Sequence, residues 1–201
     1  MIAAGVSGGI WKTEDAGASW RPVGQDMANI AVNSMAMSST NTKILYAGTG
    51  EGYFREVIRG TGLPLRGGGI YKTTDAGETW TFVASTSRAD FSWVNDLVFS
   101  PANNRRLYAA TRTGVFRSQD AGDSWTNILP TTVMGGCLDL AIRTDRSNDV
   151  LFASCGTFQQ ATVYRALDAG GAATFVEAPG QRHRARHRCV RVRRLAGHPG
   201  W

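Results

Sequence analysis

The sequence lacks several residues on which catalytic and metal-binding sites depend. Residues 1–180 contain no histidine, because all three histidines lie beyond them. A Ser–His pair for nucleophilic catalysis therefore cannot form in that part of the chain. The cysteines Cys137, Cys155 and Cys189 show no CxxC spacing, which argues against a zinc site. We expect no metal and no cofactor.

Long apolar runs are missing too. No segment approaches the roughly 18 to 20 apolar residues of a membrane-spanning helix, so no membrane span is expected. The start, MIAAGVSGG, has no basic segment before a long apolar core and predicts no signal peptide, which leaves the localisation open. The glycines 67–69 lead into an expected strand rather than a helix, so they do not predict a phosphate-binding loop.

Acidic residues are absent from residues 181–201, and this absence explains the formal charge of +6. Seven of the 22 basic residues are arginines of that segment, at positions 182, 184, 186, 188, 191, 193 and 194. The 15 basic residues that remain nearly balance the 16 acidic ones. Residues 1–180 are therefore not expected to bind nucleic acid.

The sequence does contain four related copies of one motif, and GGIYKTTDAGETW is one of these copies. Each copy ends in an aromatic residue: Trp20, Trp80, Trp125 and Phe175. The aspartates of the copies are separated by 60, 45 and 48 residues: Asp15, Asp75, Asp120 and Asp168. An alternating apolar run, an Asp-Ala-Gly turn and a second run predict a β-hairpin. The spacing favours four-stranded propeller blades over helical repeats.

Each residue type of the motif suits such a hairpin. The aspartate can accept hydrogen bonds from turn N–H groups and from Ser or Thr hydroxyls. The glycines Gly17, Gly77 and Gly122 can adopt a positive φ that other residues resist. The closing tryptophan is expected to bury its ring against the neighbouring sheet.

A second pattern supplies two more strands in each blade. VNSMAMSSTNTKILYAGTGEG from Val32 aligns with segments that begin at Val94 and Cys137, and each predicts strand, polar turn and strand. A blade thus contains strands A and B, then hairpin strands C and D. MIAAGV aligns with strand B, so the first blade is expected to lack strand A. The predicted fold is all-β, a partial β-propeller of four-stranded antiparallel blades, about three and a half in number.

The pattern S/T-x-D-x-G-x-S/T-W resembles the Asp-box, or BNR, repeat of sialidase-, xyloglucanase- and sortilin-like propellers, over roughly residues 1–178. The resemblance implies that the boxes are structural hairpins on the face away from the ligand site, and that their aspartates are not catalytic. The Arg-Ile-Pro element that precedes the first box of such sialidases has no counterpart here. Four loop acids could still serve glycoside hydrolysis: Asp26, Glu51, Glu56 and Asp90.

The second blade carries a long insertion, about fifteen residues between Gly50 and Gly69, which joins strands B and C. In an up-down blade the A–B and C–D turns share one rim, so the B–C and D–A connections share the other. We expect a ligand face on this second rim, suited to sugars, carboxylates or acidic peptides. A surface loop without a ligand is the alternative. The candidate residues are Tyr53, Phe54, Arg55, Glu56, Arg59, Arg66, Arg88, Asp90 and Trp93.

Cys137 and Cys155 are equally far from Arg146, at the centre of the A–B turn in the last blade, so a symmetric hairpin places them opposite one another. Without a predicted signal peptide, reduced and packed thiols are favoured over a disulfide.

We assign residues 1–180 to the propeller and residues 181–201 to an Arg- and His-rich tail. The tail is open to three interpretations: a frameshifted or aberrant end, a genuine basic tail, or a strand of a fifth blade. The sequence favours a non-catalytic binding or scaffold module for protein or glycan, incomplete as given, whose further partners are the missing blades of a larger propeller. The alternatives are a fragment of a BNR-repeat glycoside hydrolase and an open reading frame with no independent function.

Overall fold

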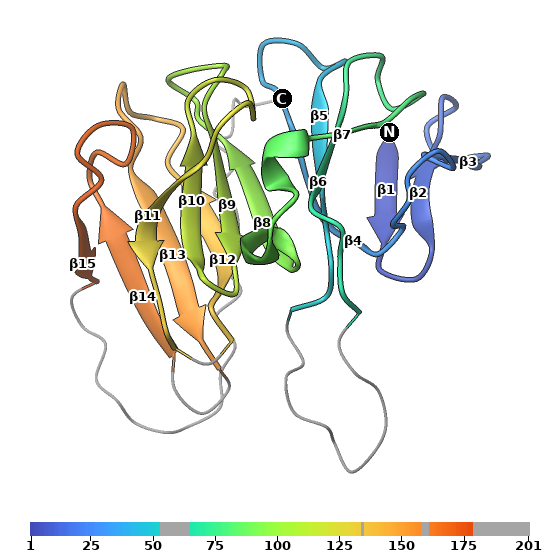
Figure 1. Cartoon of the computed structure of the whole chain (residues 1–201). Helices are drawn as coiled ribbons and strands as arrows, with labels where there is room; N and C mark the ends of the chain where they lie inside the picture. Colours follow the sequence, from blue (N-terminus) through green and yellow to red (C-terminus); the bar gives the residue numbers. More distant parts are fainter. Residues whose placement is uncertain (53–64, 134, 158–160, 179–201) are drawn as a thin grey trace.

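The computed structural model describes residues 1–52, 65–133, 135–157 and 161–178. These residues form four antiparallel sheets that follow one another along the chain and lie side by side (Figure 1). Within this part of the chain the only helices are two short 3₁₀ turns, and neither is long or apolar enough to span a bilayer. The predicted all-β fold, a partial propeller, is confirmed.

Each sheet is one blade, and the blades are numbered 1 to 4 along the chain. Blade 1 has three strands, β1 (Ile2–Gly5), β2 (Gly9–Lys12) and β3 (Arg21–Val23). Blade 2 comprises β4 (Val32–Met37), β5 (Leu45–Thr49), β6 (Ile70–Thr73) and β7 (Thr81–Phe82). Blade 3 comprises β8 (Val94–Phe99), β9 (Leu107–Thr111), β10 (Gly114–Ser118) and β11 (Thr126–Pro130). Blade 4 comprises β12 (Cys137–Ile142), β13 (Leu151–Gly156), β14 (Ala161–Ala166) and β15 (Phe175–Glu177).

The order of the strands matches the predicted frame of strands A to D. Blade 1 begins with the strand that aligns with strand B, as expected, and its described residues contain no strand A. The A strands β4, β8 and β12 pack next to one another. The 3₁₀ turns η1 (Ala84–Thr86) and η2 (Ala89–Phe91) connect blade 2 to blade 3.

A carboxylate holds together each of the first three hairpin turns, which we call box turns 13–20, 73–80 and 118–125. In box turn 73–80 the Thr73 hydroxyl donates to Asp75 Oδ1 at 2.6 Å, and the Thr79 N–H donates to the same oxygen at 3.0 Å. The Gly77 N–H donates to Thr73 Oγ1 at 3.0 Å. Because the hydroxyls of Thr73 and Thr79 bond the ionised carboxylate, the pKa of Asp75 lies well below its usual range. Thr13, Asp15 and Ser19 repeat the network in box turn 13–20, and Ser118, Asp120 and Ser124 repeat it in box turn 118–125.

The alanines of the first three Asp-Ala-Gly sequences, Ala16, Ala76 and Ala121, also have a left-handed backbone, which sequence analysis missed. Gly77 has φ +88°, as predicted, but Ala76 has φ 61°, a conformation unfavourable for a residue with a Cβ. The Ala76 N–H donates to Lys43 O in the A–B turn of the same blade at 2.9 Å. In blade 3 the Ala121 N–H donates to Arg105 O at 2.7 Å. These bonds offset the strain and fasten each box turn to the A–B turn beside it.

The closing tryptophans join neighbouring blades. Trp80 is 4% exposed and belongs to a buried cluster with Ile10, Val23 and Met27 from blade 1 and the segment after it. Trp125 of blade 3 is 8% exposed and shares a cluster with Tyr46 of blade 2. Burial of an aromatic ring of this size contributes strongly to stability. The aromatic ring of one blade thus packs on the preceding blade.

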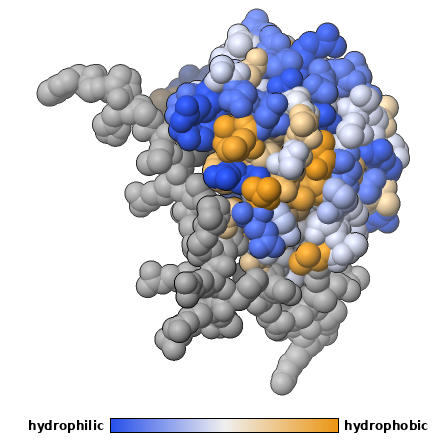
Figure 2. All heavy atoms as spheres, turned by 90° about the vertical axis from the view of Figure 1, so that its left-hand side faces the viewer, coloured by the Kyte–Doolittle hydropathy of each residue, from blue (hydrophilic) through white to orange (hydrophobic). Residues whose placement is uncertain are grey.

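Trp20 departs from this rule, since it is 39% exposed although burial was predicted for it. The described residues contain no blade before blade 1 on which it could pack. At the other end, Figure 2 shows the side of the molecule formed by blade 4, where apolar side chains are exposed among polar ones. Leu167 and Val176 of blade 4 are 57% and 48% exposed.

Cys137 and Cys155 are neighbours, as the predicted strand register requires. They pair across β12 and β13 with their Cα atoms 3.8 Å apart. Their sulfurs form a disulfide, however, where the sequence favoured reduced thiols. The disulfide closes a hairpin across 18 residues of chain separation and lies within the buried cluster shared by blades 3 and 4.

The packing of the two tryptophans predicts unequal effects of the same substitution. Trp80→Ala should lower the free energy of unfolding by roughly 3–5 kcal/mol, because it empties a buried site between two blades. Trp20→Ala, the matched control in the equivalent position, should cost much less. Urea denaturation of both variants checks this, and equal losses would contradict the assignment of Trp80 as an inter-blade residue.

Candidate functional site

The two rims of the propeller are built from different connections. The A–B turns and box turns share one rim, at the upper edge of Figure 1, because the box turns bond to the A–B turns beside them. On the other rim the Gly50 N–H donates to Ala31 O, and the Gly67 N–H donates to Ser92 O, both at 2.8 Å. The described ends of the B–C connection of blade 2 therefore bond to the D–A segments on both sides of that blade.

Two arginines and an aromatic ring come together on this second rim. Arg66 Nε donates to Ser92 Oγ at 3.3 Å. The Arg112 guanidinium lies over the Trp93 ring at 4.1 Å from its centroid, and Arg112 also donates to Gly52 O at 3.4 Å. We call Arg66, Ser92, Trp93 and Arg112 the rim cluster. It combines connections of blades 2 and 3.

Arg88 and Asp90, two other predicted site residues, are engaged with the protein itself. The Arg88 guanidinium lies over the Phe91 and Phe116 rings at 5.2 and 5.3 Å, and its Nε is 3.5 Å from Asp90 Oδ2. Asp90 Oδ1 accepts a hydrogen bond from the Thr113 hydroxyl at 2.9 Å. These contacts support the structure around the rim cluster rather than extend it.

Four of the nine predicted ligand-site residues lie among the described residues: Arg66, Arg88, Asp90 and Trp93. Arg66 bonds to Ser92, the neighbour of Trp93 in the chain, and Trp93 packs against Arg112, which sequence analysis did not select. Arg112 follows strand B of blade 3 at a position next to the predicted turn, so a search of every B–C turn would have found it. Five predicted residues lie outside the described residues: Tyr53, Phe54, Arg55, Glu56 and Arg59.

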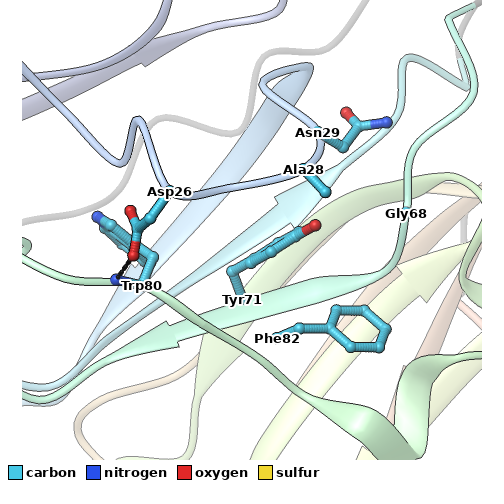
Figure 3. Close-up of a pocket in the computed structure, with 7 residues that line it drawn as sticks. All are labelled: Asp26, Ala28, Asn29, Gly68, Tyr71, Trp80 and Phe82. Atoms are coloured by element: carbon cyan, nitrogen blue, oxygen red, sulfur yellow. Dashed lines mark hydrogen bonds between the residues drawn. The ribbon is translucent and has the colours of Figure 1, made fainter.

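A second feature is a pocket of about 470 Å³ beside this rim, which we call the aromatic pocket (Figure 3). The Tyr71 and Phe82 rings lie 5.5 Å apart at an angle of 60°. Asp26 Oδ2 accepts a hydrogen bond from the Trp80 N–H at 3.0 Å. Asn29 Nδ2 donates to Arg66 O at 2.9 Å, which links the pocket to the rim cluster through the backbone. The residues that line it are Asp26, Ala28, Asn29, Gly68, Tyr71, Trp80 and Phe82.

A third feature is a pair of carboxyl groups on the adjacent A strands β8 and β12. Asp96 Oδ1 accepts the Leu97 N–H at 2.8 Å, and Oδ2 accepts the Leu140 N–H of blade 4 at 2.9 Å. Burial raises the pKa of Asp96 to about 7, and the negative charge of Asp139 adds to this effect. Asn95 beside it donates to Cys137 O at 2.8 Å. These side chains connect blade 3 to blade 4.

Comparison with known proteins bears on the fold. No protein-family model matches the chain, and no curated protein sequence matches it. The GH74 xyloglucanase from Xanthomonas campestris superposes with a TM-score of 0.66 at 16% identity, over 90% of this chain and 29% of that one. A GH74 enzyme from Niastella koreensis gives 0.62 at 20% identity, over 88% and 27%. A structure of YCF48 bound to a D1 peptide gives 0.50 at 16% identity, over 88% and 48%.

At these identities the likeness shows the fold alone, and the fold is that of a β-propeller. The chain spans less than a third of the length of the two GH74 enzymes.

The raised pKa of Asp96 predicts a pH-dependent stability. Its pKa in the folded chain, about 7, lies above the usual value of 3.8. The stabilisation by protonated Asp96 is therefore complete below the usual value and is lost as the pH rises toward the folded value. The pKa values of Asp15 and Asp75 are lowered, so the stability that their ionised carboxylates contribute is lost only as the pH falls below their usual value of 3.8. The chain should be more stable at about pH 5 than at about pH 8.

Asp96→Asn provides the test, because it keeps an acceptor for the Leu140 N–H but cannot titrate. Urea midpoints of this variant should change much less between the two pH values than those of the parent chain. A parent chain that is equally stable at both values would show that Asp96 titrates normally.

Proposed function

We propose that the chain is a non-catalytic β-propeller binding module whose ligand surface is the rim cluster. The observation that carries this proposal is the stacking of Arg112 on Trp93 beside the exposed Arg66. Connections from two blades converge there, so the blades hold the side chains in position. The box turns lie on the other rim and are engaged in internal hydrogen bonds.

The chemistry of the rim cluster favours a ligand with carboxylates. Guanidinium groups form paired hydrogen bonds with carboxylates, and an aromatic face adds apolar contact. An acidic peptide offers several carboxylates on an extended backbone. YCF48, which shares the fold, has been solved with a peptide bound, and this supports a peptide as the ligand class. A glycan that carries carboxylates is the competing class within the same proposal.

A fragment of a glycoside hydrolase of BNR-repeat type is the second candidate, supported by the fold likeness to two GH74 enzymes. Such an enzyme needs two carboxyl groups on either side of a sugar bond. Among the described acids, Asp90 is bonded to Thr113 and paired with Arg88, while Asp96 is bonded to the backbone of blade 4. The contacts of Asp90 favour binding over hydrolysis at that residue, whereas Asp26, which lines the aromatic pocket, stays a candidate acid for the hydrolase.

A titration with the acidic peptide Ac-GDEDEG-NH₂ and its amide counterpart Ac-GNQNQG-NH₂ tests the proposal. The acidic peptide alone should bind, and Arg112→Ala should weaken its binding about tenfold or more, since one well-placed charged contact is worth over about 1.4 kcal/mol. Arg112→Lys should weaken it less, because it keeps the charge while losing the stacked plane.

Arg143→Ala is the matched control, because Arg143 is an exposed arginine paired with Asp145 after strand β12. Its removal should leave the affinity unchanged. If the acidic peptide binds the Arg112→Ala and Arg66→Ala variants as tightly as the parent chain, the rim cluster is not the site. Release of sugar from xyloglucan or a sialoside by the chain would instead support the hydrolase.

A further inference from the structure

The aromatic pocket differs in charge from the rim cluster. Among the residues that line it in the described part of the chain, the only fully charged side chain is the Asp26 carboxylate. No Lys or Arg of the described residues forms an ion pair with Asp26. The rim cluster, by contrast, presents guanidinium groups. The two sites therefore suit ligands of opposite charge.

The Tyr71 and Phe82 rings line the pocket at an angle to one another. Tyr71 is 5% exposed and fixed in the buried cluster that holds Trp80, whereas Phe82, on the outermost strand of blade 2, is 36% exposed. Their planes are tilted by 60°. Figure 3 shows Tyr71 and Phe82 on one side of the pocket, with Ala28 and Asn29 across from them. Tilted aromatic faces of this kind attract cations through the negative charge of the ring face.

Asp26 adds a full negative charge to the lining of the pocket. One of its oxygens accepts the Trp80 backbone N–H, and Figure 3 shows the carboxylate beside Trp80, to one side of Tyr71. An anion would be repelled there, while an ammonium group would gain both the carboxylate and the ring faces. A neutral sugar could stack on the rings but would gain nothing from the charge.

We infer that the aromatic pocket binds the ammonium group of a lysine or N-methylated lysine side chain in a partner peptide. The methylene stem of such a side chain is apolar and matches Tyr71, Phe82 and Ala28, while its head group matches Asp26. The inference does not depend on the rim cluster, since no side chain among the described residues belongs to both sites and Asn29 bonds Arg66 only at its backbone carbonyl.

The probes are choline, its neutral isostere 3,3-dimethylbutanol, and the capped amino acid N-acetyl-trimethyllysine amide. Their binding is measured through changes in the amide chemical shifts of the full chain. The two cations should shift the signals of Gly68 and Trp80, and the neutral isostere should bind at least fivefold more weakly. Equal binding of choline and its isostere would overturn the inference, because it would show an apolar pocket without preference for charge.

Two variants separate ligand binding from structure. Asp26→Asn keeps an acceptor for the Trp80 N–H while removing the charge, and Phe82→Leu keeps an apolar side chain while removing the ring face. Each should weaken trimethyllysine binding at least fivefold. Asp123→Asn, which removes an exposed carboxylate from box turn 118–125, should leave it unchanged.

Further outcomes identify the ligand. Binding of choline without binding of the lysine derivative would overturn the assignment to a peptide. Shifts of the same signals by a xyloglucan oligosaccharide, with none from the cations, would reassign the pocket to a glycan. Loss of acidic-peptide binding in Arg112→Ala with unchanged trimethyllysine binding would confirm that the sites are separate. Failure of the rim cluster to bind peptide would leave these measurements unaffected.

Discussion

Blades 1 and 2 of this structure each depend on an aromatic ring that the following blade supplies. A four-stranded sheet has two faces, and a stable blade must cover both of them. Trp80 and Trp125 bury their rings against the preceding blades, and the hairpins that carry them are held by Asp75 and Asp120. The carboxylates thus fix the position of the ring that joins the blades.

The two rims of the molecule therefore differ in how far internal hydrogen bonds occupy their connections. The rim with the box turns is occupied by hydrogen bonds between box turns and A–B turns, such as that from Ala76 to Lys43. The other rim consists of the B–C and D–A connections, which form no box turns. The long insertion of blade 2, between Gly50 and Gly69, lies on this rim. Loops held by a rigid scaffold are common sites of binding. The rim cluster and the aromatic pocket both adjoin this insertion.

Much of the fold could be predicted because its information is local and repeated. The repeated strand–polar turn–strand segments and the Asp-Ala-Gly turns set the strands. The equal distances of Cys137 and Cys155 from Arg146 placed the two cysteines opposite one another. The left-handed alanines could not be predicted, because the strain at Ala76 and Ala121 is offset by hydrogen bonds to carbonyls of the A–B turn, a separate segment earlier in the chain. The redox state of the cysteines was missed since it follows from no sequence pattern.

The sites were harder to predict because their members come from different blades. Arg112 and Trp93 flank the Val94–Thr111 pair of the β8–β9 hairpin, so the predicted register already relates them, whereas Arg66 joins them through the B–C connection of blade 2. Asp26 lies between blades 1 and 2 and Phe82 lies on β7, so neither suggested a pocket. Trp20 shows the converse: it matches the motif as well as Trp80 does, but its exposure depends on what packs beside it.

Hydrogen exchange of the full chain, with and without the acidic peptide Ac-GDEDEG-NH₂, distinguishes structural box turns from a ligand-binding rim. Added protection is expected in residues 48–52, 65–69 and 88–93 and around Arg112, with box turns 13–20, 73–80 and 118–125 unchanged. Protection confined to the box turns would show that the ligand binds there and not on the opposite rim.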